Sequence, residues 1–344
     1  NSIFQFDVME VSSPIEKFYF SENANRIVIL ENGSAVFCSN TSDENMTRCG
    51  VTDDKSTKIN DIEYIELNDS VYRCVSLKKS GSFGMTDIAL YDISSDECIY
   101  YYTCGNENNN ISKVELFAKN NKVYMYIIED DGFFGTASVL HVIDVSAKKE
   151  VREIDLLEKD IDADSIIFSQ DHSVMVGETE RELAVFNISE TEIENIPIIE
   201  VDSGKEISAC GKLSDRDEVV FIIEDFFDEE KDAKLFTYDI SSDNLKSIDI
   251  HLNSSDKIKM VTGKKSSRIC VYSGDMFYVI DGDNGKIISQ IVLMENLSKD
   301  TLVDFDFFNE DNDLLVTYGN TVFMYNVLTA NLVDSLMYDT SDAL

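Results

Sequence analysis

The stretch FTYDISS, residues 236–242, shows most clearly the phrase that recurs along this chain. In it an aromatic or branched residue precedes Asp239, and an apolar residue and a turn follow it. Close copies are ALYDISS (89–95), HVIDVSA (141–147), VFNISE (185–190), YVIDGDNG (278–285) and FMYNVLT (323–329). A poorer copy, SAVFCSN (34–40), carries Cys38 in place of the Asp. The chain is therefore expected to repeat one structural unit from end to end.

The period of the repeat indicates the architecture. The aligned Asp, Asn or Cys positions are 38, 92, 144, 187, 239, 281 and 326, which lie 42 to 54 residues apart. Periods of about 40 to 50 residues with several strands each are typical of propellers. One unit, for example, divides into IKMVTG, RICVYSG, MFYVID and KIISQIVL, which are rich in branched and aromatic residues. The pattern predicts an all-β fold, a seven-bladed β-propeller of four-stranded antiparallel blades with very little helix.

The repeat also predicts a single propeller domain over residues 1–344. Residues 1–14 form a lead-in strand in this interpretation. The blades then span approximately 15–52, 59–105, 110–158, 163–200, 205–251, 256–294 and 300–338.

The phrases YDISSD, VIDVSAKKE and VIDGDNGK resemble the third strand and following turn of WD40-like and quinoprotein-like propeller repeats. The likeness covers nearly all of residues 15–338 and implies architecture only. The chain contains no Trp, so the Trp-Asp dipeptide of WD repeats is absent and no quinone cofactor is implied. We therefore expect no cofactor.

Composition narrows the classes of partner. The 344 residues include 66 Asp and Glu against 29 Lys and Arg, a formal net charge of −37. This charge argues against nucleic acid as a partner, and the 43% hydrophobic content argues against a disordered chain. Apolar runs are too short for a spanning helix.

Cys74, Cys210 and Cys270 lie in strand-like runs. Free thiols favour a reducing, cytoplasmic compartment, although an extracytoplasmic location stays open.

Three intervals in the repeat are longer than the others. Those ending at 92, 144 and 239 span 52 to 54 residues, against 42 to 45 for those ending at 187, 281 and 326. The extra residues fall between the second and third strands, in KKSGSFGMTD (78–87), EDDGFFGTAS (129–138) and EDFFDEEKDA (224–233). In up-and-down blades these hairpins emerge on one rim. The candidate partner-binding residues on them are Phe83, Phe133, Phe134, Phe226, Phe227, Asp228, Glu229 and Glu230.

Aromatic side chains on projecting loops suit an interface, and the neighbouring acids would select a protein partner with a basic surface. The competing interpretation is that the hairpins extend their strands and that these Phe residues pack on one another.

Candidate chemistry is sparse. The three histidines, His141, His172 and His251, show no metal-like spacing, and His141 is expected to be structural. Asp160, Asp162 and Asp164 form a weak candidate metal site, but the sixth position of that run is Ser165 rather than Gly, so it is not an EF-hand. No catalytic residue is assigned.

These observations favour a non-catalytic protein–protein interaction platform that belongs to a larger assembly. One alternative is an extracytoplasmic ligand- or ion-binding propeller domain of a membrane-associated or secreted protein. The other is a propeller hydrolase or lyase with acids around the channel mouth, because fold alone does not determine function.

Overall fold

The computed structural model describes the chain in segments: residues 15–21, 26–31, 34–39, 47–49, 57–67, 70–79, 84–92, 95, 97–105, 109–132, 135–169, 171–180, 182–189, 195–201, 205–213, 216–225, 232–253, 258–273, 276–292, 302–318 and 321–337. Before residue 70 it describes the backbone only. The chain divides into two compact units, the first of Asn1–Asp164, Gly319–Thr321 and Met337–Leu344, the second of Ser165–Tyr318 and Val322–Leu336.

Unit 1 contains three antiparallel sheets, each made of four strands that are consecutive in sequence. Their strands are β1 (Ile15–Ser21), β2 (Arg26–Glu31), β3 (Ser34–Ser39) and β4 (Thr47–Cys49); β5 (Thr57–Leu67), β6 (Ser70–Lys79), β7 (Asp87–Asp92) and β8 (Glu97–Thr103); and β9 (Asn110–Lys119), β10 (Lys122–Asp130), β11 (Ala137–Asp144) and β12 (Lys149–Asp155). A 3-10 turn, η1 (Leu157–Lys159), follows β12, and η2 (Ala163–Ser165) leads to the next sheet.

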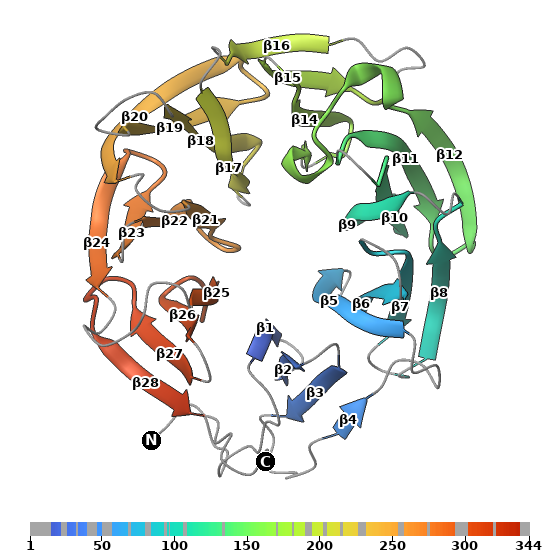
Figure 1. Cartoon of the computed structure of the whole chain (residues 1–344), viewed down its shortest axis with the longest axis horizontal. Coiled ribbons are helices and arrows are strands. Elements are labelled where there is room, and N and C mark those ends of the chain that lie inside the picture. The colour runs from blue at the N-terminus through green and yellow to red at the C-terminus, as the bar shows by residue number, and fades with distance from the viewer. Residues whose placement is uncertain are drawn as a thin grey trace. The chain divides into compact units, whose positions relative to one another are not determined.

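Unit 2 repeats the arrangement in four sheets (Figure 1). Their strands are β13 (Ile167–Phe168), β14 (Val174–Glu178), β15 (Glu182–Asn187) and β16 (Asn195–Glu200); β17 (Lys205–Leu213), β18 (Glu218–Asp225), β19 (Asp232–Asp239) and β20 (Asn244–Asn253); β21 (Lys259–Thr262), β22 (Arg268–Ser273), β23 (Met276–Asp281) and β24 (Lys286–Val292); and β25 (Leu302–Phe308), β26 (Asp313–Tyr318), β27 (Thr321–Asn326) and β28 (Leu332–Met337).

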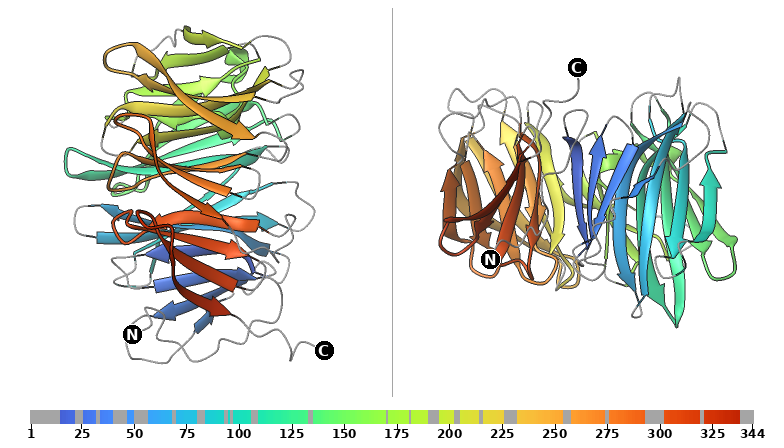
Figure 2. Two further views of the ribbon diagram at one scale, coloured as in Figure 1. Left: turned by 90° about the vertical axis from the view of Figure 1, so that its left-hand side faces the viewer. Right: turned by 90° about the horizontal axis from the view of Figure 1, so that it is seen from below.

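The prediction of an all-β propeller with four-stranded antiparallel blades is confirmed. Every sheet is a meander in which each strand pairs with the one before it, and the sheets are visibly twisted (Figure 2). In the segments that the structure describes, no helix is long and apolar enough to cross a membrane. Residues 1–14, predicted as a lead-in strand, lie outside the described residues.

Inner strands of unit 2 bury both of their faces, as β18 shows. In β18, Val219, Phe221 and Ile223 pack toward the sheet of β14 and β15. The alternate residues Val220 and Ile222 pack toward the sheet of β21–β24. This division follows from the two-residue period of a strand. A continuous apolar run such as EVVFIIE therefore belongs between two sheets, and a one-residue slip would exchange the two packing faces.

Unit 1 shows the same packing between neighbouring sheets. Ile88 and Leu90 of β7 share a buried cluster with Met125 and Ile127 of β10. Fully burying such a side chain contributes about 1.5–3 kcal/mol. Neither sheet could bury this surface alone.

The recurring Asp or Asn has a local structural role at the end of the third strand. Asp239 Oδ1 accepts hydrogen bonds from the Ser241 amide (2.9 Å), the Ser241 hydroxyl (2.7 Å) and the Ser242 amide (3.1 Å). The equivalent side chains accept in the same way from residues two or three positions later: Asp144 from Ala147, Asn187 from Ser189, Asp281 from Asp283, and Asn326 from Thr329. Such Asx turns reverse the chain into the fourth strand. The repeated phrase is therefore a turn signal.

We predict that Asp239→Ala lowers the free energy of unfolding by about 1 kcal/mol at neutral pH, because it removes the acceptor of this turn. Asp239→Asn keeps an acceptor oxygen, as the native Asn187 and Asn326 do, and should retain most of the stability. Urea unfolding of the two variants measures the difference, and equal losses would contradict the turn role.

The two variants should also differ in their response to acid. Hydrogen bonds from Ser241 and then Ser242 lower the pKa of Asp239 to about 2. The ionised carboxylate therefore stabilises the fold above the ordinary pKa of about 3.9, and this contribution is lost as the pH falls from there toward about 2. Between about pH 5 and about pH 2, Asp239→Asn should consequently lose less stability than the wild type. Identical losses in unfolding titrations would contradict the assignment.

Candidate functional site

The three long hairpins connect the second and third strands of their sheets, where the sequence intervals place them: β6 to β7, β10 to β11, and β18 to β19. The candidate partner-binding residues themselves, Phe83, Phe133, Phe134, Phe226, Phe227, Asp228, Glu229 and Glu230, lie outside the described residues. The bases of the hairpins are described, and each holds a buried carboxylate.

Asp87 lies at the base of the first hairpin and is only 1% exposed. It accepts hydrogen bonds from the hydroxyls of Thr86 (2.7 Å) and Thr103 (2.6 Å). The Cys104 amide donates to the Thr86 carbonyl (3.0 Å), so the segment after β8 is tied to the same base. Because a buried carboxylate is costly unless it is hydrogen-bonded, these donors stabilise the start of β7 and its contact with β8.

Asp130 has the same role in the second hairpin. It accepts from the Gly132 amide (2.5 Å), from Asn110 Nδ2 (3.4 Å) and from the Ser112 hydroxyl. Gly132 has φ +70°, a left-handed conformation that glycine adopts without strain. Asp130 therefore ties the outgoing arm of this hairpin to the first strand of the same sheet.

The first two hairpins lie next to each other in unit 1. Met85, just before β7, bridges Ile111 of β9, and Ile111 pairs with Glu129 of β10. On the other side, Thr136 bridges Asp162.

In unit 2, the third hairpin starts from buried Glu224, which pairs with fully buried Ala233. All three bases are therefore well-packed parts of their sheets.

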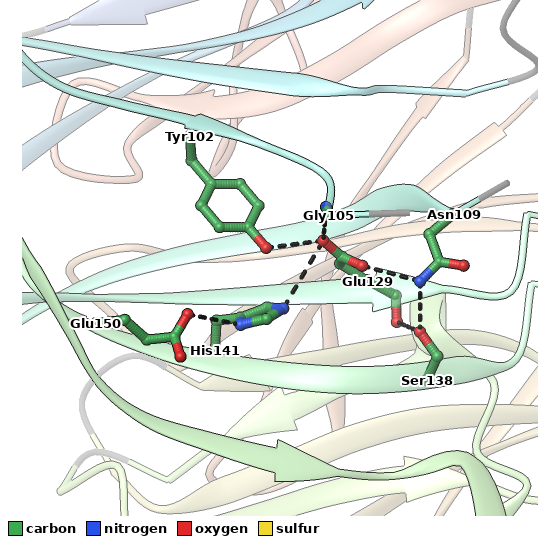
Figure 3. A network of polar contacts seen from close by, with 7 residues as sticks. All are labelled: Tyr102, Gly105, Asn109, Glu129, Ser138, His141 and Glu150. Carbon is green, nitrogen blue, oxygen red and sulfur yellow. Dashed lines mark hydrogen bonds and ion pairs between the residues drawn. The ribbon is translucent and has the colours of Figure 1, made fainter. Parts of the chain in front are cut away.

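A polar network around Glu129 occupies the interior of unit 1 (Figure 3). Glu129 is 3% exposed and comes from β10, next to Asp130. Its Oε1 accepts from the Tyr102 hydroxyl (2.7 Å) and the Gly105 amide (3.3 Å), and its Oε2 accepts from Asn109 Nδ2 (2.9 Å). The carboxylate thus joins β8, the segment that follows β8, and β10.

His141 of β11 extends this network toward the surface. Its Nε2 lies 3.7 Å from Glu129 Oε1, and its Nδ1 lies 3.0 Å from Glu150 Oε2 of β12. The Tyr102 ring lies beside the imidazole, with 5.4 Å between ring centroids. His141 lies in a third strand, as the sequence predicted, and it is buried.

The network raises the pKa of two side chains, Tyr102 and Cys104. Burial, followed by the hydrogen bond to Glu129, raises the pKa of Tyr102 far above its usual value. Burial and the negative charge of Glu129 likewise raise the pKa of the Cys104 thiol. Since the thiolate is the nucleophilic form of cysteine, Cys104 is poorly suited to covalent catalysis.

The structure does not gather the run of Asp160, Asp162 and Asp164 into a shared set of ligand atoms. Asp162 Oδ1 accepts a hydrogen bond from the Asp164 amide (2.9 Å), as in a turn. Partial desolvation and the charges of Asp162 and Asp130 raise the pKa of Asp164. Within the described residues, the group of His, Cys, Asp or Glu that could hold a metal is instead His141, Glu150 and Glu153.

Sequence reasoning missed Glu129, Glu150 and Glu153, although a signal for Glu129 exists. Three acids, Glu129, Asp130 and Asp131, follow the apolar run VYMYII (123–128), and an acid at the end of a buried strand must find donors. Glu150 and Glu153 look like ordinary surface acids in KKEVREID, and only the pairing of β12 with β11 brings them to His141.

Exposed apolar side chains on fourth strands were also not anticipated. In unit 2 they are Ile196, Leu245, Ile287, Val292, Leu332 and Val333, with Leu328 in the turn before β28. In β24 the pairs Ile287–Ile288 and Ile291–Val292 break the alternation of a one-sided strand. One member of each pair must therefore face outward.

Comparison with known proteins identifies the fold class. No family model and no curated protein sequence matches the chain. Solved structures do match over nearly its whole length. The complex of KlAtg21 with the coiled-coil of AgAtg16 has a TM-score of 0.62 at 12% identity, covering 95% of this chain and 100% of that one. Kluyveromyces lactis Hsv2 has a TM-score of 0.58 at 12% identity, with coverage of 95% and 100%.

A third match is an enzyme by its name. Dihydro-heme d1 dehydrogenase NirN in complex with DHE has a TM-score of 0.57 at 12% identity, and the match covers 95% of this chain and 67% of that one. At such identities the likeness establishes the fold alone. The resemblance to WD40-like propellers is supported at that level.

We predict that Glu129→Gln lowers the free energy of unfolding by about 1–3 kcal/mol. The Glu129 carboxylate accepts hydrogen bonds from three donors. In the variant an amide NH2, which cannot accept, takes the place of one carboxylate oxygen. Glu158→Gln, on the exposed surface of η1 in the same unit, is the matched control and should change stability by less than about 0.5 kcal/mol. Urea unfolding measures both. Equal effects would show that the network around Glu129 contributes nothing specific.

Proposed function

We propose that this protein is a non-catalytic protein–protein interaction platform. In this proposal the three long hairpins present Phe83, Phe133, Phe134, Phe226 and Phe227 to a partner, with Asp228, Glu229 and Glu230 beside them. The observation that carries the proposal is the buried carboxylate at the base of each hairpin, Asp87, Asp130 and Glu224. Bases held by buried side chains reduce the ordering cost of binding.

The charge of the chain supports a basic partner surface. The net charge is −37, and the described residues beside the second hairpin, Asp131, Asp162 and Asp164, are acidic. Complementary charge would increase the association rate and disfavour acidic competitors. The KlAtg21 structure, solved with a coiled-coil of AgAtg16, provides an example of a similar fold with a protein partner.

The raised pKa values of Tyr102 and Cys104 keep this hydroxyl and this thiol protonated, so neither group is activated as a nucleophile. A hydrolase or lyase would instead need a group whose pKa is shifted toward its reactive form. Measured turnover of ester or glycoside substrates would contradict this part of the proposal.

We predict that replacing Phe133, Phe134, Phe226 and Phe227 by Ala together weakens partner binding at least about tenfold and leaves the melting temperature unchanged, since buried aromatic residues dominate interface energies. Proteins captured by the wild type and by the variant are first compared by mass spectrometry. The affinity of the purified partner is then measured. Lost stability with intact binding would support packing of these Phe residues on one another.

A second variant tests the location of the binding surface. Replacing Ile287, Val292 and Leu332 by Ser alters exposed apolar residues of β24 and β28 and should leave partner binding unchanged. If this variant alone lost the partner, the outer strands rather than the hairpins would be the binding surface.

We also propose that the chain forms a seven-bladed β-propeller. The sheet count and the repeat of 42 to 54 residues support this arrangement. An experimental density map should show seven blades, and a map with six or eight would contradict it.

A further inference from the structure

Three ligand-bearing side chains converge on β11 and β12 of unit 1. One donor atom each from His141, Glu150 and Glu153 lies within 4.8 Å of the other two. Glu153 is the direct cross-strand partner of His141. The register shifts between Val142 and Ile143, and this bulge brings Glu150 to the side of the strand where Glu153 lies.

The imidazole is held between two carboxylates in an orientation suited to metal binding. Nδ1 faces Glu150 Oε2 at 3.0 Å, and Nε2 lies 3.7 Å from Glu129 Oε1 (Figure 3). His141 is 8% exposed, and its buried Nε2 makes no hydrogen bond. A metal-ligating histidine commonly directs its other ring nitrogen at a carboxylate, which sets the tautomer and makes the ligating nitrogen more basic. Glu129 is the carboxylate on that side of the ring, at an ion-pair distance rather than a hydrogen-bond distance.

We propose that His141 Nδ1, Glu150 and Glu153 form a binding site for a divalent transition metal, with Zn²⁺ as the best match to this donor set. Zinc binds imidazole nitrogen and carboxylate oxygen, and sites with three protein ligands leave a position for water or another ligand. Calcium and magnesium prefer all-oxygen sites, so the nitrogen donor disfavours them.

Access and charge both fit a bound cation. Glu150 and Glu153 are exposed while His141 is buried, so an ion could enter from solvent and rest against the imidazole. Glu129, Glu150 and Glu153 place three carboxylates around one imidazole. The Tyr102 ring packs beside His141 and limits rotation of the ligand.

The competing interpretation is that a proton takes the place of the metal. A protonated imidazole between Glu129 and Glu150 would also satisfy the cluster, as a buried ion pair. The two interpretations differ in one measurable property, because only a metal site binds zinc with a defined stoichiometry.

The test is to titrate the full chain with Zn²⁺ alone at neutral pH. Calorimetry and equilibrium dialysis measure the affinity and the number of ions bound. We expect one tight zinc per chain that depends on these three residues. His141→Gln and Glu153→Gln should each weaken this binding at least tenfold. Glu153 is exposed, so its variant tests the site without threatening the fold.

Matched controls separate this site from adventitious binding. His172→Gln removes a histidine outside the cluster, and Cys98→Ser removes an exposed thiol; both should leave the tight zinc in place. Glu129→Gln should weaken zinc about 10- to 100-fold, as expected for a carboxylate that supports a ligand. Co²⁺ should give visible absorption bands of a low-coordinate site in the wild type and lose them in His141→Gln.

Several results would overturn the proposal. The first is that the wild type binds no tight, stoichiometric zinc. The second is that His141→Gln and Glu153→Gln bind zinc as well as the wild type does. The third is that His172→Gln or Cys98→Ser loses the zinc. Retained zinc binding by Glu129→Gln at full affinity would remove only the supporting role given to Glu129.

Discussion

The burial of both faces of inner strands such as β18 against neighbouring sheets is the constraint on which the rest of the structure depends. Strand β18 divides its side chains between two apolar clusters, one on each side of its sheet. A four-stranded sheet with two apolar faces cannot bury both of them by itself, so sheets of this kind are stable only when stacked. Polar groups are then restricted to strand ends, turns and the fourth strands, unless hydrogen-bond donors accompany them into the interior.

The acids at the hairpin bases are polar groups inside the packed sheets, and they form part of the candidate site. Asp87, Glu129 and Asp130 are buried, and each receives hydrogen bonds from neighbouring strands or loops. Each carboxylate therefore determines where a loop leaves its sheet, because losing the donors would leave a buried charge uncompensated. His141 lies between Glu129 and Glu150, so one polar network is shared by the packed part of unit 1 and the proposed metal site.

The elements predicted from the sequence were those governed by neighbours in the chain. Asp239 and its counterparts end third strands because their side chains bond the next two or three residues, which is a local effect. His141 was placed correctly in a third strand, but its partners were not found, since Glu150 and Glu153 reach it through a register shift between β11 and β12. The exposed apolar residues of β24 could have been found, because adjacent apolar residues on a strand must point to opposite faces.

The amino-acid sequence alone determined the class of fold, the four-stranded unit, the turn at the end of each third strand and the positions of the three long hairpins. All of these follow from residue spacing and short-range hydrogen bonding. Only the tertiary structure decided which acids are buried, which donors satisfy them, and that His141, Glu150 and Glu153 share a site. The reason is that strand pairing and sheet stacking bring together residues whose spacing along the chain carries no record of their contact.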